Sequence, residues 1–565
     1  MLSYRKLAMR VLGRPLHTGG GIDSPRPASQ RAAALILTAA LLTGAAFPAF
    51  AGTYYIEEGD ITISAGTVAG TNKVEQGGTL KSENDKDTVI TNQKTDTASS
   101  HTVTIDAGKD KVEVTLKDVN IDTSSRNNAA VSVTGSGNTT IKLDGDNHLT
   151  GGISDNGSYG LSGISSSGSL TISGGETDSL TAQGGSGTDG SGGRGIFSKD
   201  LTISGGTVNA NGGDGKNGSG GSGITSLGSL TISGGTVNAA GGDGTNSSDG
   251  GDGITNNRGV TISSGGTVTA KGGSGEDGSG GRGISSFGGV TISSGGTVTA
   301  TGGNSTGSDG SGGDGISSTS TTISGGTVTA DGGSGNFSGG NGIRSFDVAI
   351  SGGTVNVAGG NGGNGSGSDV GNGIYSSDID LSGSLELTAK AGSPNGKALS
   401  QRGNELDLDD IKDKLGPGAK VTAINANGDS KQVSIPRPVE PEEPVIPGDS
   451  SSSSGGGSAD ASVQESVFPG LVVTDKDGQR ISYTSTQSGN TLTVCVGRFT
   501  ASLRASLAAL RQLRAEGIET ITFQTILCST TLSVDELLAM GGEDTEVVLT
   551  HHIRSSTLTV GGKAV

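Results

Sequence analysis

Histidine-based chemistry is excluded from the repetitive part of this chain. The five histidines among its 565 residues are His17, His101, His148, His551 and His552. None lies between positions 164 and 400, so neither a Ser-His-Asp triad nor a histidine metal site can form there. A polysaccharide lyase would instead need calcium-binding carboxylates and an Arg or Lys base. Residues 152–400 hold nine Lys and Arg and 19 Asp and Glu, but many of them recur at repeat positions rather than in an irregular cluster. We therefore predict no catalytic residues and no enzyme activity.

One recurring polar position lies two residues before an isoleucine that follows glycine. It is occupied in successive repeats by Arg194, Ser222, Asp252, Arg282, Asp314, Asn341 and Asn372. In a stacked structure these side chains would be neighbours, so Asp252, Arg282 and Asp314 would alternate in sign. We expect exposed ion pairs, each stabilising the fold by only about 0.2–1 kcal/mol.

A second recurring position follows a Gly-Gly pair. Its occupants are Ser186, Asp214, Asp243, Ser274, Asn304, Ser334 and Asn361. Asp and Asn at such a place are typical of turns. Asp214 beside Asp243 could alternatively share a calcium ion if carbonyl groups supply further ligands. Turn formation is the favoured interpretation, and a metal site stays undetermined.

A third pattern would place hydroxyl groups in flat columns. Thr267 and Thr269 recur as Thr297 and Thr299 and as Thr327 and Thr329, and the pairs Thr207/Asn209, Thr236/Asn238 and Thr354/Asn356 extend them. Such an array could hydrogen-bond an extended sugar chain, match an ice lattice, or reflect the preference of β-branched residues for strands. Trp is absent and aromatic residues make up 3% of the chain. Ring stacking on sugars is therefore largely unavailable, and we expect any glycan contact to be polar or metal-bridged.

The element that positions these columns is a repeat of about 30 residues. Gly-Ile pairs place Ile164, Ile196, Ile224, Ile254, Ile284, Ile316, Ile343 and Ile374 at intervals of 27 to 32 residues. Each unit holds three short alternating segments separated by glycines, which predicts three strands per turn of a parallel β-helix. Inward positions such as Leu201, Ile203, Val208 and Ala210 would stack into aliphatic ladders. Corner glycines such as Gly205-Gly206 and Gly265-Gly266 suit turns that need positive φ or lack room for a Cβ.

Composition and charge support an exported protein. The chain has 107 Gly and a net charge of −18, and the part after residue 51 carries −23. Such a surface repels nucleic acid, so we predict no nucleic-acid partner. Residues 1–51 combine a basic region, an apolar run and Ala49-Phe50-Ala51, which predicts a signal peptide and a secreted or cell-surface location. No later segment is long and apolar enough to predict a membrane span.

The domain organisation follows from shifts in composition. We place the β-helix at residues 52–430, with capping turns before residue 150 and a short helix over Glu405 to Leu415. Residues 431–465 are rich in Pro, Ser and Gly and predict a linker.

Residues 466–565 predict a small α+β domain with a helix from Thr500 to Gly517. A Ser533–Glu536 capping box should precede a second helix. Strands are expected at Leu492–Val496, Glu519–Cys528 and Glu546–Thr550. Cys495 and Cys528 could form a disulfide or remain two buried thiols, and His551 is expected at the surface.

The segment from Asp106 to Gly152 carries a family resemblance. Its stretches KVEVTLKDVNID, NAAVSV and TTIKLDGDNHLTGG, followed by GSLTISGG units, resemble the secreted bacterial carbohydrate-binding β-helix proteins, which are related in fold to pectate lyases. The resemblance covers about residues 60–400. It implies a right-handed parallel β-helix, non-catalytic binding of acidic plant polysaccharide such as polygalacturonate, and bound calcium. Cell-wall or cell-surface association would fit the same reading. A structural or adhesive surface rod is the alternative function, and a polysaccharide lyase is a third.

Overall fold

The computed structural model divides the chain into two compact units, Met1–Pro441 and Glu442–Val565. The described residues of the first unit are 52–155, 157–246, 248–293, 295–363 and 371–436. Those of the second are 471–475, 479–481, 483–488, 490–496, 498, 500–525, 529–542, 545–552, 555–561 and 563–564. The predicted signal peptide and most of the predicted linker therefore lie outside the described residues.

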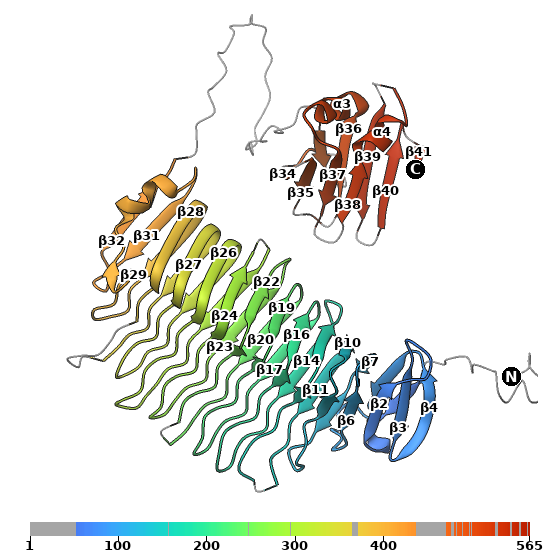
Figure 1. Ribbon diagram of the computed structural model, residues 1–565, viewed down its shortest axis with the longest axis vertical. Coiled ribbons are helices and arrows are strands. Elements are labelled where there is room, and N and C mark those ends of the chain that lie inside the picture. The colour runs from blue at the N-terminus through green and yellow to red at the C-terminus, as the bar shows by residue number, and fades with distance from the viewer. Residues whose placement is uncertain are drawn as a thin grey trace, which may run out of the picture. The chain divides into compact units, whose positions relative to one another are not determined.

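The first unit is a parallel β-solenoid of about 13 turns, as the repeat predicted (Figure 1). A typical turn consists of β15 (Ile196–Ser198), β16 (Asp200–Ile203) and β17 (Thr207–Asn211). Each strand pairs in parallel with its counterpart one turn later, so that Ile196 lies beside Ile224 and Ile203 beside Ile232. Identical positions of successive repeats thus become spatial neighbours.

In the described part of the N-terminal and central turns, strand follows strand, and η1 (Ile56–Glu58) is the one helical element. The N-terminal elements are β1 (Thr53–Tyr55), η1 (Ile56–Glu58), β2 (Ile61–Ala65), β3 (Asn72–Gln76), β4 (Thr79–Asp85), β5 (Thr88–Thr91), β6 (Val103–Asp106), β7 (Lys111–Lys117), β8 (Asn120–Asp122), β9 (Val131–Thr134), β10 (Asn138–Asp144) and β11 (Asp146–Thr150). The other central strands are β12 (Ile164–Ser166), β13 (Ser169–Ser173), β14 (Ser179–Gln183), β18 (Ile224–Ser226), β19 (Ser229–Ile232), β20 (Thr236–Ala240), β21 (Ile254–Asn256), β22 (Gly259–Ile262), β23 (Thr267–Lys271), β24 (Ile284–Ile292), β25 (Thr297–Thr301), β26 (Ile316–Asp331), β27 (Ile343–Ala358) and β28 (Ile374–Lys390).

The core is the predicted aliphatic ladder. Ile232, Ile262 and Ile292 are in register on β19, β22 and β24, and all three are fully buried. Val and Ala of the third strand form a parallel ladder, for example Val268 next to Val298. Since large aromatic side chains would break this repeat, small β-branched residues fill the interior, and burial of their apolar surface stabilises every turn.

The corner glycines have the backbone conformation that was predicted. Gly206 has a φ of 75° and Gly265 a φ of 84°, in the region that residues with a Cβ rarely occupy. Gly205 differs, because a Cβ there would press on the carbonyl oxygen of Gly174. Glycine is thus required at these corners for two separate reasons.

The Gly-rich loops form a packed layer that the repeat pattern did not predict. Each loop runs out from the third strand and returns to the next first strand, and both arms carry Gly-Gly pairs. The N–H of Gly221 donates to the carbonyl of Gly213 within one loop, and the N–H of Gly242 donates to Gly221 from the next loop, both at 2.8 Å. The same alternation continues through Gly251, Gly273, Gly281, Gly303, Gly313, Gly333, Gly340 and Gly360. We call this arrangement the glycine layer. It satisfies backbone groups that would otherwise need water.

Both ends of the solenoid are capped. At the N-terminal end, β2, β3 and β4 pair antiparallel (Figure 1). Arg126 donates two hydrogen bonds to Asp60, at 3.0 and 3.1 Å, and these bonds, together with its charge, lower the pKa of that carboxyl to about 2.

The C-terminal end holds β29 (Leu399–Gln401), β30 (Asn404–Glu405), the 3₁₀ helix η2 (Leu408–Lys414), β31 (Lys420–Ile424) and β32 (Ser430–Ser434). The expected helix at Glu405 to Leu415 is therefore a 3₁₀ helix, with Leu408 and Ile411 buried. β32 continues to Ser434, beyond the residue 430 at which the sequence places the end of the solenoid.

The second unit is a small domain of two sheets and two helices. Its elements are β33 (Leu471–Thr474), β34 (Thr484–Ser488), β35 (Thr491–Cys495), β36 (Ala501–Ser506), α3 (Leu507–Ala515), β37 (Thr520–Gln524), β38 (Ser529–Ser533), α4 (Val534–Leu538), β39 (Glu546–His552), β40 (Ser555–Val560) and β41 (Lys563–Ala564). The capping box is confirmed, since the Ser533 side chain accepts the N–H of Glu536 at 3.4 Å.

The predicted helix from Thr500 to Gly517 is wrong in its first part. Residues Ala501–Ser506 form strand β36, whose alternate side chains are buried against β33 and β39. Ser506 then caps α3 by accepting the N–H of Ala509. The leucine spacing suited a helix, but the pairing of β36 with two neighbouring strands decides the structure.

Among the described residues, no helix is long and apolar enough to cross a membrane.

The aliphatic ladder predicts a strong effect of a buried charge. Ile262→Asp should lower the free energy of unfolding by about 3 kcal/mol or more, because the carboxyl would lie unpaired between two isoleucines. Thr261→Asp is the matched control, since Thr261 is exposed on the same strand. Chemical denaturation measures both variants, and equal midpoints would contradict the ladder.

The glycine layer predicts a similar contrast between two glycines. A Cβ on Gly281 would overlap the carbonyl oxygen of Gly251, whereas a Cβ on Gly259 would make an ordinary contact of 3.5 Å. Gly281→Ala should destabilise the solenoid by about 1–3 kcal/mol, and Gly259→Ala should do so much less. Thermal unfolding compares them, and an unaffected Gly281→Ala variant would show that the layer is not close-packed.

Candidate functional site

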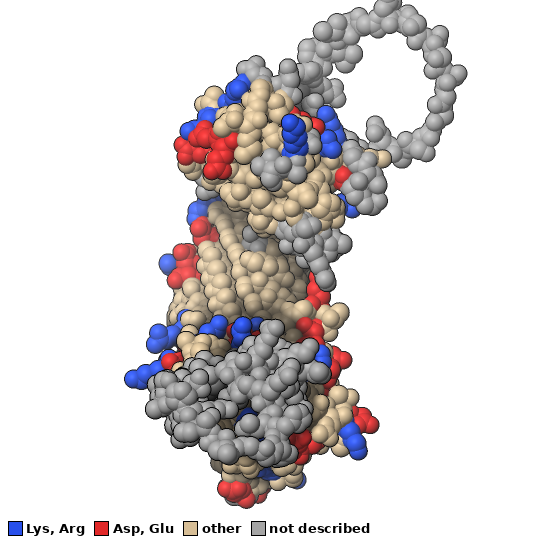
Figure 2. Space-filling model, turned by 90° about the vertical axis from the view of Figure 1, so that its right-hand side faces the viewer, with Lys and Arg blue, Asp and Glu red and all other residues tan. Residues whose placement is uncertain are grey.

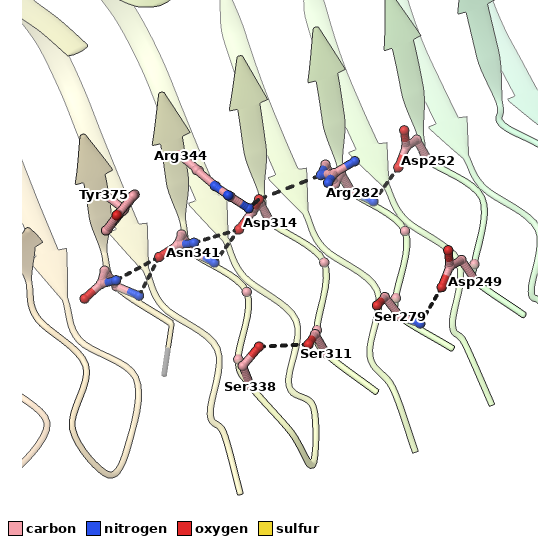
Figure 3. A pocket seen from close by; sticks show the side chains of 18 of the residues that line it. Asp249, Asp252, Ser279, Arg282, Ser311, Asp314, Ser338, Asn341, Arg344 and Tyr375 are labelled. Carbon is pink, nitrogen blue, oxygen red and sulfur yellow. Dashed lines mark hydrogen bonds and ion pairs between the residues drawn. The ribbon is translucent and has the colours of Figure 1, made fainter. Parts of the chain in front are cut away.

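A groove of about 960 Å³ crosses successive turns of the solenoid, with lining residues from Ser219 to Gly403 (Figure 3). It is lined by glycines from the returning arms of the glycine layer. It is also lined by the polar column at the position two residues before each Gly-Ile isoleucine. Six members of that column line it: Ser222, Asp252, Arg282, Asp314, Asn341 and Asn372. We call it the polar groove.

The column is a ladder of side-chain to backbone hydrogen bonds. Asp314 Oδ1 accepts the backbone N–H of Asn341 at 2.7 Å, and Asn341 Oδ1 accepts that of Asn372 at 3.0 Å. The backbone N–H of Lys397 donates to Asn372 Oδ1 at 2.9 Å, so the ladder continues for one more turn. Asp or Asn recurs because a short side chain with an oxygen at this distance can satisfy the next turn.

The expected alternation of charge is present, but one member is not exposed as predicted. Asp314 Oδ2 lies 3.7 Å from Arg282 Nε and 3.9 Å from a guanidinium nitrogen of Arg344, and its side chain is only 7% exposed. Asp252 accepts the N–H of Arg282 at 2.7 Å. Burial raises the pKa of the Asp252 carboxyl, although the N–H and charge of Arg282 oppose that shift. The expectation of exposed pairs therefore fails for Asp314.

The first member of the column lies outside the polar groove. Arg194 Nε donates to Thr225 Oγ1 at 3.1 Å, and the guanidinium stacks on the Phe197 ring at 5.2 Å from its centroid. Burial lowers the pKa of Arg194. This arginine is therefore held by contacts within the solenoid.

The polar groove has an acidic half and a basic half. Asp249 and Asp252 line the turns nearer the N-terminus, and Arg344 lines a turn nearer the C-terminus (Figure 3). Tyr375 and then Lys397 line the groove beyond Arg344. Arg344 lies beside Tyr375 on paired strands β27 and β28, and both are exposed.

Sequence reasoning missed Arg344, Tyr375 and Lys397 as groove residues. Arg344 and Tyr375 follow the Gly-Ile isoleucine at a position where most units have Ser or Thr. That departure from the repeat was the available signal.

The second polar column accepts backbone N–H groups of the next turn of the solenoid. Asp214 Oδ1 accepts the N–H of Asp243 at 2.9 Å, and Asp243 Oδ1 accepts that of Ser274 at 2.7 Å. The two carboxylates are brought together as expected, each bound to the backbone of the next turn. Within the described ranges, no group of three or more His, Cys, Asp or Glu side chains is arranged to hold a metal ion.

The threonine columns are confirmed in register. Thr267, Thr297 and Thr327 are successive neighbours on the third strands, and Thr269, Thr299 and Thr329 form the second column. Asn238 Nδ2 also donates to Asn209 Oδ1 at 2.8 Å along this face. On the face of the molecule shown in Figure 2, uncharged solenoid surface lies between margins where Lys, Arg, Asp and Glu gather.

The candidate residues of the second unit, His551 and Cys495, are held by contacts within that unit. Contrary to the surface prediction, His551 is fully buried, with Nδ1 3.1 Å from Thr525 Oγ1 and Nε2 3.0 Å from Thr530 Oγ1. Burial lowers the pKa of this imidazole. Cys495 is half-buried and its Sγ lies 3.4 Å from Gln524 Oε1. Cys495 is a free thiol, so the disulfide alternative does not form in this structure, and Cys528 lies outside the described residues.

The chain has no match among models of known protein families, curated proteins or solved structures. Its resemblance to the carbohydrate-binding β-helix proteins therefore rests on the sequence motifs and the solenoid fold alone.

The ladder predicts a specific stability contrast at Asp314. Asp314→Ala should lower the free energy of unfolding by about 1–3 kcal/mol, because the N–H of Asn341 would lose its acceptor in a covered site. Asp314→Asn should lose less, since it keeps an oxygen acceptor. Chemical denaturation is the measurement, with the exposed Asp277→Ala as control. Equal losses in the Ala and Asn variants would contradict the hydrogen-bond role.

Proposed function

We propose that this protein is a secreted, non-catalytic binding protein for an acidic extracellular polysaccharide such as polygalacturonate. The observation that carries the proposal is the polar groove, because it runs along the solenoid axis, is open to solvent and crosses many turns. An extended polymer can contact every turn in such a groove, whereas a small molecule would occupy only part of it. The sequence resemblance and the signal-peptide pattern of residues 1–51 support the polysaccharide class and the extracellular location.

The basic half of the polar groove suits the carboxylates of uronic acids. Arg344 is 57% exposed in its side chain, and its contact with Asp314 at 3.9 Å is long. Its guanidinium can therefore donate paired hydrogen bonds to a ligand carboxylate. Lys397 supplies a second positive charge further along the same wall.

The acidic half requires a different contact. Asp249 and Asp252 would repel a polyanion, and the −18 charge of the chain acts in the same direction. A divalent cation between protein and sugar carboxylates would remove this repulsion. Calcium is thus a proposed partner of the complex, in addition to the direct contacts of Arg344 and Lys397.

The arrangement favours binding over cleavage. Arg282 and Arg344 both lie beside the Asp314 carboxylate, so each already has an anionic partner within the groove. Asp314 and Asn341 accept backbone N–H groups of the next turn. These groups position the chain rather than form a reaction centre.

The double variant Arg344→Gln, Lys397→Gln should bind polygalacturonate roughly tenfold more weakly, equivalent to about 1.4 kcal/mol. Lys109→Gln is the control, since Lys109 is exposed on an N-terminal turn away from the groove. Affinity electrophoresis of the purified protein measures the change, and added chelator tests the calcium contribution. Equal binding by the double variant and the Lys109→Gln control would contradict the groove assignment. Release of unsaturated uronides from the polymer would establish a lyase instead.

A further inference from the structure

A second column of outward side chains lies at the corner after the first strand of each turn. In successive turns it holds Leu227, Asn257, Phe287, Thr319, Phe346 and Ser377. We call it the corner column. Apolar and polar residues alternate along it, so an apolar side chain appears on every second turn.

The register of this column is established by neighbouring contacts. The preceding residues Ser286, Ser318 and Ser345 pair in successive turns of β24, β26 and β27. Thr319 Oγ1 donates to the backbone oxygen of Phe287 at 2.9 Å, and Ser376 Oγ donates to that of Phe346 at 2.8 Å. The phenylalanines are therefore held at fixed backbone positions.

The apolar side chains of the corner column are strongly exposed. Phe287 is 75% exposed, Phe346 66% and Leu227 44%. Single exposed apolar residues are ordinary on a protein surface, but three at a regular two-turn interval in a chain with nine Phe are not. Stacked strands lie about 4.8 Å apart, so the interval is roughly 9.6 Å. Small polar residues separate the rings, which leaves no contiguous apolar patch of the kind that buries a protein partner.

The corner column runs beside the polar groove without lining it. Phe346 lies two residues after Arg344 on β27, and both side chains are exposed. Two residues of a strand span about 6.6 Å. A polymer in the groove therefore has the corner column alongside it, one ring for every two turns.

We propose that Phe287 and Phe346 stack on sugar rings of the polysaccharide, contacting stretches that carry no charge, such as methyl-esterified uronate. A pyranose presents an apolar face of C–H groups and a rim of hydroxyl groups. The aromatic ring can cover that face. The hydroxyl of Thr319, between the two phenylalanines, already donates its proton to the backbone oxygen of Phe287, so its oxygen can accept a hydrogen bond from the rim. The sequence predicts that ring stacking on sugars is largely unavailable, and this proposal departs from that prediction at two exposed rings. This inference rests on the proposed function, and adds a contact that does not depend on the carboxylates.

The test compares two polymers and two pairs of substitutions. Phe287→Ser, Phe346→Ser should weaken binding to methyl-esterified polygalacturonate at least about tenfold and change binding to the de-esterified polymer much less. The Arg344→Gln, Lys397→Gln protein should show the opposite preference. Tyr159→Ser is the control, because Tyr159 is 56% exposed on an earlier turn. Phe287→Tyr, Phe346→Tyr should retain binding, and matching thermal unfolding shows that the variants are folded.

The outcomes separate this inference from the proposed function. If the unmodified protein binds only the de-esterified polymer, or if the serine variant weakens both polymers equally, the corner column is not a stacking site and the groove proposal stands. If neither polymer binds, both proposals fail. Self-association of the unmodified protein that the serine variant abolishes, measured by sedimentation, would show that the column covers a second copy instead.

Discussion

The register between successive turns is the constraint on which the rest of this structure depends. Parallel pairing places each residue beside its counterpart one repeat away, as with Ile232, Ile262 and Ile292. A side chain must therefore be compatible with a copy of itself about 4.8 Å above and below. Aliphatic residues meet this condition in the core, threonine meets it on the strand faces, and Asp or Asn meets it where an oxygen must reach the next backbone N–H. The groove is a consequence of the same register.

Glycine has a second structural role beyond the corners. In the glycine layer the two arms of each loop approach so closely that a Cβ on Gly281 would overlap a neighbouring carbonyl oxygen. The alternating hydrogen bonds between arms replace those a strand would make, and they align peptide groups through many turns. This packing explains why 107 glycines are compatible with an ordered chain, even though glycine carries the largest entropic cost of ordering.

Much of the fold could be predicted because it is periodic. The spacing of the Gly-Ile pairs predicted the turns, the inward ladder and the polar columns, including the neighbours of Asp252 and Arg282. What could not be predicted depends on contacts between elements without a periodic signal. The burial of Asp314, the closeness of the loop arms and the exposure of Phe287 are of this kind. In the second unit, strand β36 was missed because leucine spacing indicates a helix unless its pairing partners are known.

The repeat intervals vary from 27 to 32 residues while the paired strands stay in register. The variation is therefore taken up in the loops and by single residues at the corners between strands, and a whole turn is an exchangeable unit. Duplication or loss of one such segment in the gene would lengthen or shorten the solenoid without disturbing the turns on either side, as in other repeat proteins. Each added turn would also extend the polar groove by one more set of ligand contacts. Natural selection could then tune avidity for a long polymer through copy number, without inventing a new residue at any position.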